Sequence, residues 1–229
     1  MTTLATCCAL VLLGLLPASA ARADSEIEGV DVSDGTVDWV SGHAKGGAFA
    51  YLEATQGKSG VNSAFDRLTL GATTAGLYHG AYHVAAPGAS RGMDQANFFV
   101  DHGGAWKAED GRTLPGAIVL QEKSKCDGLE PAAMVAWLKE FSNTYRTRTT
   151  RAPVIATTSA WWKTCTDDSV DFGAVNPLWI LHPGKSTGPL PAGWKSYALW
   201  RYAAAGAKGS DRLNGDEAAL EQFAVPNGA

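Results

Sequence analysis

The chain has 229 residues, a formal net charge of −4 at pH 7, and 45% hydrophobic residues. This length suits one domain of barrel size. The acidic balance argues against nucleic acid as a partner, because binding to phosphates requires a basic face.

Residues 1–23 have the layout of a cleaved secretory signal. Residues 4–16 form an apolar run that is too short to span a bilayer, and a stretch of small residues follows it. We expect cleavage after Ala20 or Ala23, which leaves a single secreted domain, residues 24–229, without a membrane span. No Lys or Arg precedes the apolar run, as a mis-assigned start codon or a weak signal would explain. A short N-terminal anchor is the alternative.

Short apolar runs of the β type recur along the mature chain. Several are nearly continuous in apolar residues, as strands covered on both faces should be. The expected strands are 30–32, 49–54, 80–85, 117–121, 154–157, 178–181 and 197–202.

Helical patterns separate the first five of these strands. Apolar residues recur at a spacing of three to four over 61–76, 93–102 and 130–148, and the helical pattern fades after Trp162. The order of elements predicts an α/β protein, a β/α barrel whose last third consists mostly of bare strands.

Two of the four cysteines lie in the expected signal, which leaves Cys126 and Cys165. An oxidising compartment would bridge this pair, and two independent buried thiols are the alternative. The sequence contains no Cys-x-x-Cys, no clustered histidines and no phosphate-binding glycine loop, so we expect neither a metal nor a cofactor.

In a β/α barrel the working residues lie at the C-terminal ends of the strands. Acidic and aromatic side chains that converge there suit sugar recognition or glycoside hydrolysis. The candidates are Asp31, Glu53, Gln56, Tyr82, His83, Gln121, Glu122, Trp161, Trp162, His182, Arg201, Tyr202 and Asp211.

Several segments resemble glycoside hydrolase family 25, the Chalaropsis-type lysozymes that cut peptidoglycan between muramic acid and glucosamine. They include GVDVSDGTVDW (29–39), AGLYHGAYHVAAP (75–87), LPGA (114–117) and PLPAGWKSYALWRYA (189–203). The resemblance implies an irregular TIM-like barrel of five βα units followed by three mostly bare strands. It also implies a disulfide between the two remaining cysteines, peptidoglycan or a related glycan as partner, and a secreted or cell-wall location.

The fourth strand departs from the family pattern, which reads Leu-Pro-Gly and then Asp-x-Glu with the Glu as proton donor. Counting from Leu114 without a gap puts Val119 at the Asp position and Gln121 at the Glu position. An inserted residue would instead bring Glu122 to the donor position and Leu120 to the Asp position. The ungapped count is the simpler, because alternation along a strand turns Glu122 to the other face.

The remaining matched residues suggest a groove that still holds sugar. By resemblance, Tyr82 and His83 line it, although His83 also fits a hydrogen-bonded barrel residue. One of Trp161 and Trp162 is expected to be a sugar platform and the other a core residue. Trp200 is also expected to contact substrate.

Two further residues bear on the charge of the groove. Arg201 replaces a family Gln, so its positive charge would compensate the negative charge of Asp31 or Asp211. Asp211 itself is expected to orient the residues in the floor of the site.

Gln cannot donate a labile proton, and general acid catalysis contributes roughly 10²–10⁴-fold in rate. The sequence therefore predicts a lysozyme-like protein that binds or acts on peptidoglycan with weak or lost muramidase activity. One alternative is an active muramidase that uses Asp31 with Glu122, and another is a hydrolase with an altered substrate and a relocated acid such as Glu53.

Overall fold

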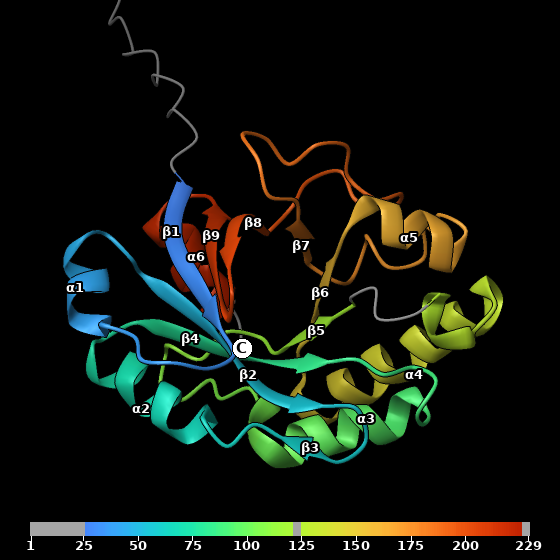
Figure 1. Ribbon diagram of the computed structural model, residues 1–229, viewed down its shortest axis with the longest axis horizontal. Helices are drawn as coiled ribbons and strands as arrows, with labels where there is room; N and C mark the ends of the chain where they lie inside the picture. Colours follow the sequence, from blue (N-terminus) through green and yellow to red (C-terminus); the bar gives the residue numbers. More distant parts are fainter. Residues whose placement is uncertain (1–25, 121–124, 226–229) are drawn as a thin grey trace, which may run out of the picture.

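The computed structural model describes residues 26–120 and 125–225, which form a closed β-barrel with helices packed outside it (Figure 1). The expected signal, residues 1–23, lies outside the described residues. Within the described part, no helix is long and apolar enough to cross a membrane.

The barrel consists of eight strands in the order β1-β9-β8-β7-β6-β5-β4-β2, and it closes because β2 pairs in parallel with β1. A ninth strand, β3, extends β2 as a short antiparallel arm. The bounds are β1 (Glu26–Val32), β2 (Phe49–Gln56), β3 (Gly60–Val61), β4 (Tyr78–Val84), β5 (Ala117–Val119), β6 (Val154–Thr157), β7 (Leu178–Leu181), β8 (Leu199–Ala205) and β9 (Lys208–Asn214).

Helices follow each of the first five barrel strands, and the last three strands follow one another without a helix between them. The helices are α1 (Trp39–Ala44), α2 (Phe65–Thr74), α3 (Gly92–Phe99) continued by η1 (Val100–Gly104), η2 (Lys125–Gly128), α4 (Pro131–Thr149), α5 (Ser159–Thr166) and α6 (Glu217–Ala224). In Figure 1, α2, α3 and α4 line one side of the barrel, and β1, β8 and β9 form the opposite wall. The predicted architecture of five βα units and three mostly bare strands is confirmed.

The barrel interior is packed with large side chains. Tyr51 on β2 and Trp179 on β7 come from strands that are not neighbours in the sheet, yet their ring centroids lie 5.0 Å apart. Val119, Leu199 and other fully buried residues complete the same cluster. The interior is therefore a core and not a pore, so no ligand passes through it, and the active site of such a barrel is expected at the strand ends.

The longest helix, α4, shows why the chain outside the barrel folds as predicted. Pro131 begins it, where a missing N–H does no harm, and Thr150 ends it in the left-handed conformation. Its buried face includes Trp137 and Phe141, which join the outward-facing residues of the strands in a second cluster. The predicted disulfide is also confirmed: Cys126 and Cys165 are bonded, with their Cα atoms 5.3 Å apart.

Candidate active-site groove

A polar groove lies where the parallel strands end, as the barrel architecture predicts. It begins as a cavity of about 220 Å³ whose lining includes Asp31, Glu53, Tyr82 and Arg201. A neighbouring cavity of about 370 Å³ shares Glu53 and two other lining residues with it, so the two form one continuous groove. The other lining residues are Ser33, Asp34, Gln56, Gly60, Val61, Asn62, Ser63, Val84, Ala204, Gly206, Ala207, Lys208 and Gly209.

The carboxylate of Asp31 is held by Arg201 in a bidentate ion pair. Arg201 Nε donates to Oδ2 at 2.7 Å, and Nη2 donates to Oδ1 at 2.6 Å. The two side chains are only 7% and 13% exposed, respectively, and the guanidinium carbon lies 5.0 Å from the centroid of the Trp179 ring. The expectation that Arg201 offsets an acidic residue is therefore met at Asp31.

Strand β9 makes room for this ion pair. It lies between β1 and β8, with Gly209 opposite Asp31 and Asp211 opposite Arg201. A Cβ atom at position 209 would collide with Asp31 Oδ2, so the pair depends on glycine there. The sequence interpretation missed Gly209. The one feature that could have revealed its role is that a very small residue occupies an inward position of a polar strand.

Asp211 lies beneath Asp31 and is fully buried. Trp179 Nε1 donates to its Oδ1 at 2.8 Å, and the Asp211 carboxyl interacts directly with that of Asp31. Burial, followed by the negative charge of Asp31, raises the pKa of Asp211 well above its usual value. Asp211 therefore keeps its proton and donates it to Asp31, which fits the predicted role in the floor of the site.

Asp31 is subject to opposing influences. Burial raises the pKa of Asp31, while the charge of Arg201 and hydrogen bonds from Arg201 and Asp211 oppose that shift. Because Asp211 is the more deeply buried of the two and has no cation of its own, the shared proton belongs to Asp211, and Asp31 is the ionised member.

Tyr82 and Glu53 form the opposite wall of the groove. The Tyr82 hydroxyl donates to Glu53 Oε2 at 3.3 Å. Burial and the charges of Asp31 and Glu53 raise the pKa of Tyr82, so its hydroxyl remains a donor at neutral pH. Tyr82 thus lies where the sequence placed it, and Glu53 lies in the same cavity as Asp31.

His83 points away from the groove, contrary to the predicted substrate contact. It follows inward-facing Tyr82 on β4, so alternation turns it outward, where it is fully buried. Its ring nitrogens hydrogen-bond with Thr55 Oγ1 at 2.8 Å and Gln95 Oε1 at 3.0 Å, and its ring stacks on Phe141. Burial lowers the pKa of His83 to about 4, so it is a neutral core residue.

The three tryptophans considered as substrate contacts are also core residues, although a core position was expected for only one of Trp161 and Trp162. Trp161, Trp162 and Trp200 are buried, and none lines the groove as the described residues define it. The indole N–H of Trp162 donates to the Ser169 carbonyl, and that of Trp200 donates to the His182 carbonyl. Each N–H is satisfied by backbone, as buried indoles require, so neither ring is a platform for sugar.

The fourth barrel strand, β5, has an apolar inner face in its described part. Ala117 and Val119 join the interior cluster, whereas Ile118 and Leu120 pack against the helices outside. The inward and outward alternation agrees with the count from Leu114 without a gap, which assigned Val119 to the position of the family Asp. It places Val119, which is buried, inside the barrel. The two predicted donor positions, 121 and 122, lie outside the described residues, and their roles stay predictions.

Among residues 26–120 and 125–225, no three or more His, Cys, Asp or Glu side chains are grouped so as to hold a metal ion. The charged groups that the groove brings together in this part of the chain are Asp31, Arg201, Glu53 and Lys208, with Asp34 at its outer end. The arrangement offers hydrogen-bond donors and acceptors of both charges for a polar ligand.

Comparison with known proteins identifies the family. The sequence matches glycosyl hydrolases family 25 over residues 30–210. It is 37% identical over 208 residues to lysozyme M1 of Streptomyces globisporus, which covers 86% of this chain and 70% of that protein. It is 37% identical over 210 residues to the N,O-diacetylmuramidase of Chalaropsis sp, covering 87% of this chain and 99% of the relative.

A solved structure agrees with these relatives. The muramidase from Acremonium alcalophilum is 41% identical and has a TM-score of 0.83, and the match covers 86% of this chain and 98% of that one. The barrel, the groove at its strand ends and the matched sequence agree, and the chain belongs to glycosyl hydrolases family 25.

Proposed function

We propose that this protein is a secreted, lysozyme-like protein that binds bacterial peptidoglycan through the groove and hydrolyses it weakly or not at all. The observation that carries the proposal is the bidentate ion pair between Asp31 and Arg201. The names of the relatives, lysozyme and N,O-diacetylmuramidase, support the cell-wall glycan as the ligand.

Glycoside hydrolysis requires one acid to protonate the leaving group and a second carboxylate to attack, to activate water or to stabilise the cation. Asp31 lies in a segment that matches the family and faces the groove. Both of its oxygens accept hydrogen bonds from Arg201. The guanidinium neutralises the charge that would stabilise an oxocarbenium-like transition state. To act, Asp31 would first have to leave a largely buried ion pair.

Three other positions that match the family pattern do not supply the acid. Asp211 holds a proton, but it is fully buried beneath Asp31 and does not line the groove. Val119 stands at the sequence position of the family Asp and is an apolar residue packed inside the barrel. By the ungapped count Gln121 occupies the donor position, and its amide cannot protonate a leaving group.

Binding depends on different features, which the groove provides. Tyr82, Glu53 and Gln56 line the groove with hydrogen-bonding groups that match sugar hydroxyls and amides. Asn62 donates to the backbone carbonyls of Ser33 and Glu53 at 2.6 and 2.9 Å, which ties β3 to the ends of β1 and β2 and fixes the wall of the groove. A preformed polar wall supports binding without hydrolysis.

A second candidate function is an active muramidase with a changed acid. Glu53 supports it, because this carboxyl lines the same cavity as Asp31. The acid would then be Glu53, or Glu122 if the strand contains an inserted residue.

The test combines a binding and a cleavage measurement on the same peptidoglycan. Purified protein is incubated with insoluble walls, bound protein is measured after sedimentation, and released reducing ends are counted. The proposal predicts binding with little release. Release that persists in Glu122→Gln but disappears in Glu53→Gln would establish the relocated acid, and the reverse pattern would establish Glu122. Absence of binding would refute the assigned ligand.

A further inference from the structure

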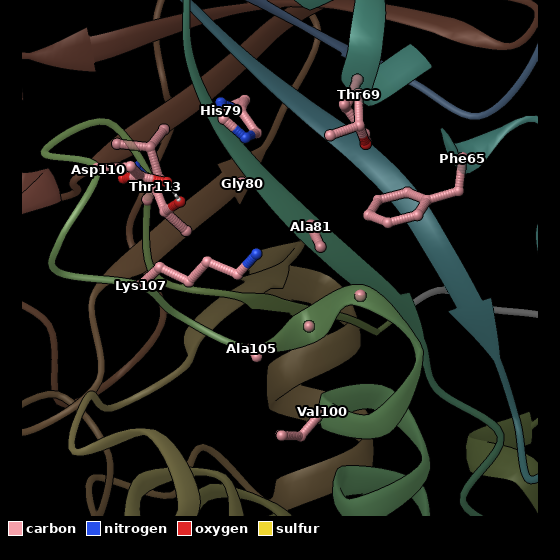
Figure 2. A pocket seen from close by; sticks show the side chains of 14 residues that line it. Phe65, Thr69, His79, Gly80, Ala81, Val100, Ala105, Lys107, Asp110 and Thr113 are labelled. Atoms are coloured by element: carbon pink, nitrogen blue, oxygen red, sulfur yellow. Dashed lines mark hydrogen bonds between the residues drawn. The ribbon is translucent and has the colours of Figure 1, made fainter. Parts of the chain in front are cut away.

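A second pocket lies on the side of the barrel between β4, α2 and η1 (Figure 2). We refer to it as the lateral pocket. Its volume is about 310 Å³, at the lower end of the range of small-molecule sites. Within the described residues it shares no lining residue with the groove.

Part of the wall of the lateral pocket is apolar. Phe65, Leu52, Val100 and Leu114 line it, and the ring of Phe65 points into it from α2 (Figure 2). Gly103 at the end of η1 has a φ of 108°, and a side chain there would collide with this ring. Such walls favour a ligand with an apolar face.

Two buried polar atoms in this lining have no hydrogen-bond partner in the described part of the chain. They are Thr69 Oγ1 and His79 Nδ1. A buried polar atom without a partner destabilises a protein by about 1–3 kcal/mol, so such atoms are rare unless something else satisfies them. A ligand in the lateral pocket would satisfy both.

The imidazole of His79 defines what that ligand must offer. Nδ1 is a buried ring nitrogen without a hydrogen-bond partner. Burial lowers the pKa of His79, so the ring is neutral, and Nδ1 donates or accepts according to the tautomer. A hydroxyl group can also donate or accept, so it suits both Nδ1 and the Thr69 hydroxyl.

Lys107 gives the pocket a positive charge. Figure 2 shows its side chain extending into the pocket from the wall opposite Phe65. Lys107 makes no ion pair within the described residues. The nearby carboxylate of Asp110 already accepts hydrogen bonds from the Thr113 hydroxyl and from the backbone N–H groups of Arg112 and Thr113. The ammonium group is thus available for an anionic group on a ligand.

We propose that the lateral pocket is a second binding site, for a single hydroxylated ring of sugar size that carries a carboxylate. A hydroxyl group forms a hydrogen bond with His79 Nδ1, a second polar group contacts Thr69, and the carboxylate pairs with Lys107. The apolar face of the ring packs against Phe65. This site is separate from the groove and does not depend on whether the groove cleaves glycan.

The test uses two sugars that differ by one acidic group. N-Acetylmuramic acid carries a lactyl carboxylate that N-acetylglucosamine lacks. Each is titrated into isotope-labelled full-length protein, and amide and imidazole chemical shifts are followed by NMR. We expect saturable chemical-shift changes at Thr69, His79 and Lys107. N-Acetylmuramic acid should bind with higher affinity than N-acetylglucosamine.

Variants locate the interaction. Thr69→Val keeps the shape but removes the hydroxyl, and we expect its Kd to rise about tenfold, whereas Thr69→Ser retains binding. Lys107→Met should make the two sugars bind equally. Thr73→Val, an exposed change on the same helix, is the matched control and should bind as the unchanged protein does.

Three results would overturn the proposal. They are shifts confined to Asp31 and Tyr82 in the groove, affinity that Thr69→Val and Lys107→Met leave unchanged, and no saturable binding of either sugar at millimolar concentration. The last result would mean that water alone satisfies the two polar atoms. Wall binding and cleavage, measured separately, are expected to be unchanged in the Thr69 and Lys107 variants, so failure here is distinct from failure of the proposed groove function.

Discussion

Replacing Arg201 by Gln removes the cation from a buried carboxylate, and its effect on stability should depend on pH. Asp31 is 7% exposed in its side chain and has both oxygens bonded to the guanidinium. Removing one partner of a buried ion pair destabilises a protein by about 3–5 kcal/mol, because the other charge is left uncompensated. Arg201→Gln is therefore expected to lose about that much free energy of unfolding at neutral pH.

The pH dependence follows from the direction of the pKa shift. Without Arg201, the charge and hydrogen bonds that oppose the effect of burial are largely lost, so burial raises the folded-state pKa of Asp31 further above its unfolded value of about 3.9. A group with a raised folded-state pKa stabilises the protein fully below the unfolded pKa, and this stabilisation is lost as pH rises through the folded pKa. Relative to the unchanged protein, Arg201→Gln should thus be least destabilised in acid and most destabilised at neutral pH.

Denaturant unfolding of both proteins across the pH range measures the difference, and the double variant Asp31→Asn/Arg201→Gln is the control. The amide has no charge to leave uncompensated, so the double variant should be more stable than Arg201→Gln alone at neutral pH. A loss below about 1 kcal/mol, the range of exposed ion pairs, would refute the reasoning. A loss that does not vary with pH would refute it as well.

Three further changes test other parts of the structure. Asp211→Asn should alter the free energy of unfolding by less than about 1 kcal/mol, because an amide can still donate a hydrogen bond to Asp31. In the same denaturant assay, Asp211→Leu should be strongly destabilising. Replacing Cys126 and Cys165 by Ala should destabilise the protein by about 4 kcal/mol, since the bond closes a loop with a sequence separation of 39; an unchanged midpoint would contradict this. His83 has a folded-state pKa of about 4, below its unfolded value. Its neutral form therefore stabilises the protein above about pH 6.5, and this contribution is lost as pH falls toward 4. In His83→Gln, the part of the acid-induced loss of stability that His83 causes should be absent.

Much of the fold was predictable because local signals agreed with it. The seven expected strands match seven of the barrel strands to within a few residues, since each is a short apolar run. Strand β9 was missed because its inward positions include Gly209 and Asp211, so its sequence has no apolar run. Its pairing with β1 and β8 shows that tertiary contacts define it.

The site was predictable in part, for the same reason. The rule that barrel sites lie at strand ends grouped Asp31, Tyr82, Arg201 and Asp211, which lie close together in the structure. It could not decide which of two adjacent residues points inward, so His83 was assigned to the groove although it lies outside the barrel.

The aromatic residues show a second limit. Composition alone does not separate a sugar platform from a core residue, and Trp161, Trp162 and Trp200 are all core residues. The bidentate geometry between Asp31 and Arg201 depends on Gly209, which no local pattern marks.

The most direct measurement of the central claim is the rate at which reducing ends are released from peptidoglycan by the variant Val119→Asp/Gln121→Glu, compared with the unchanged protein. The variant restores the two acidic positions of the family strand. If missing acids limit cleavage, the rate should rise by roughly 10²–10⁴-fold while wall binding stays similar. Brisk release by the unchanged protein, with no gain in the variant, would show that the groove already contains a working acid and would contradict the account.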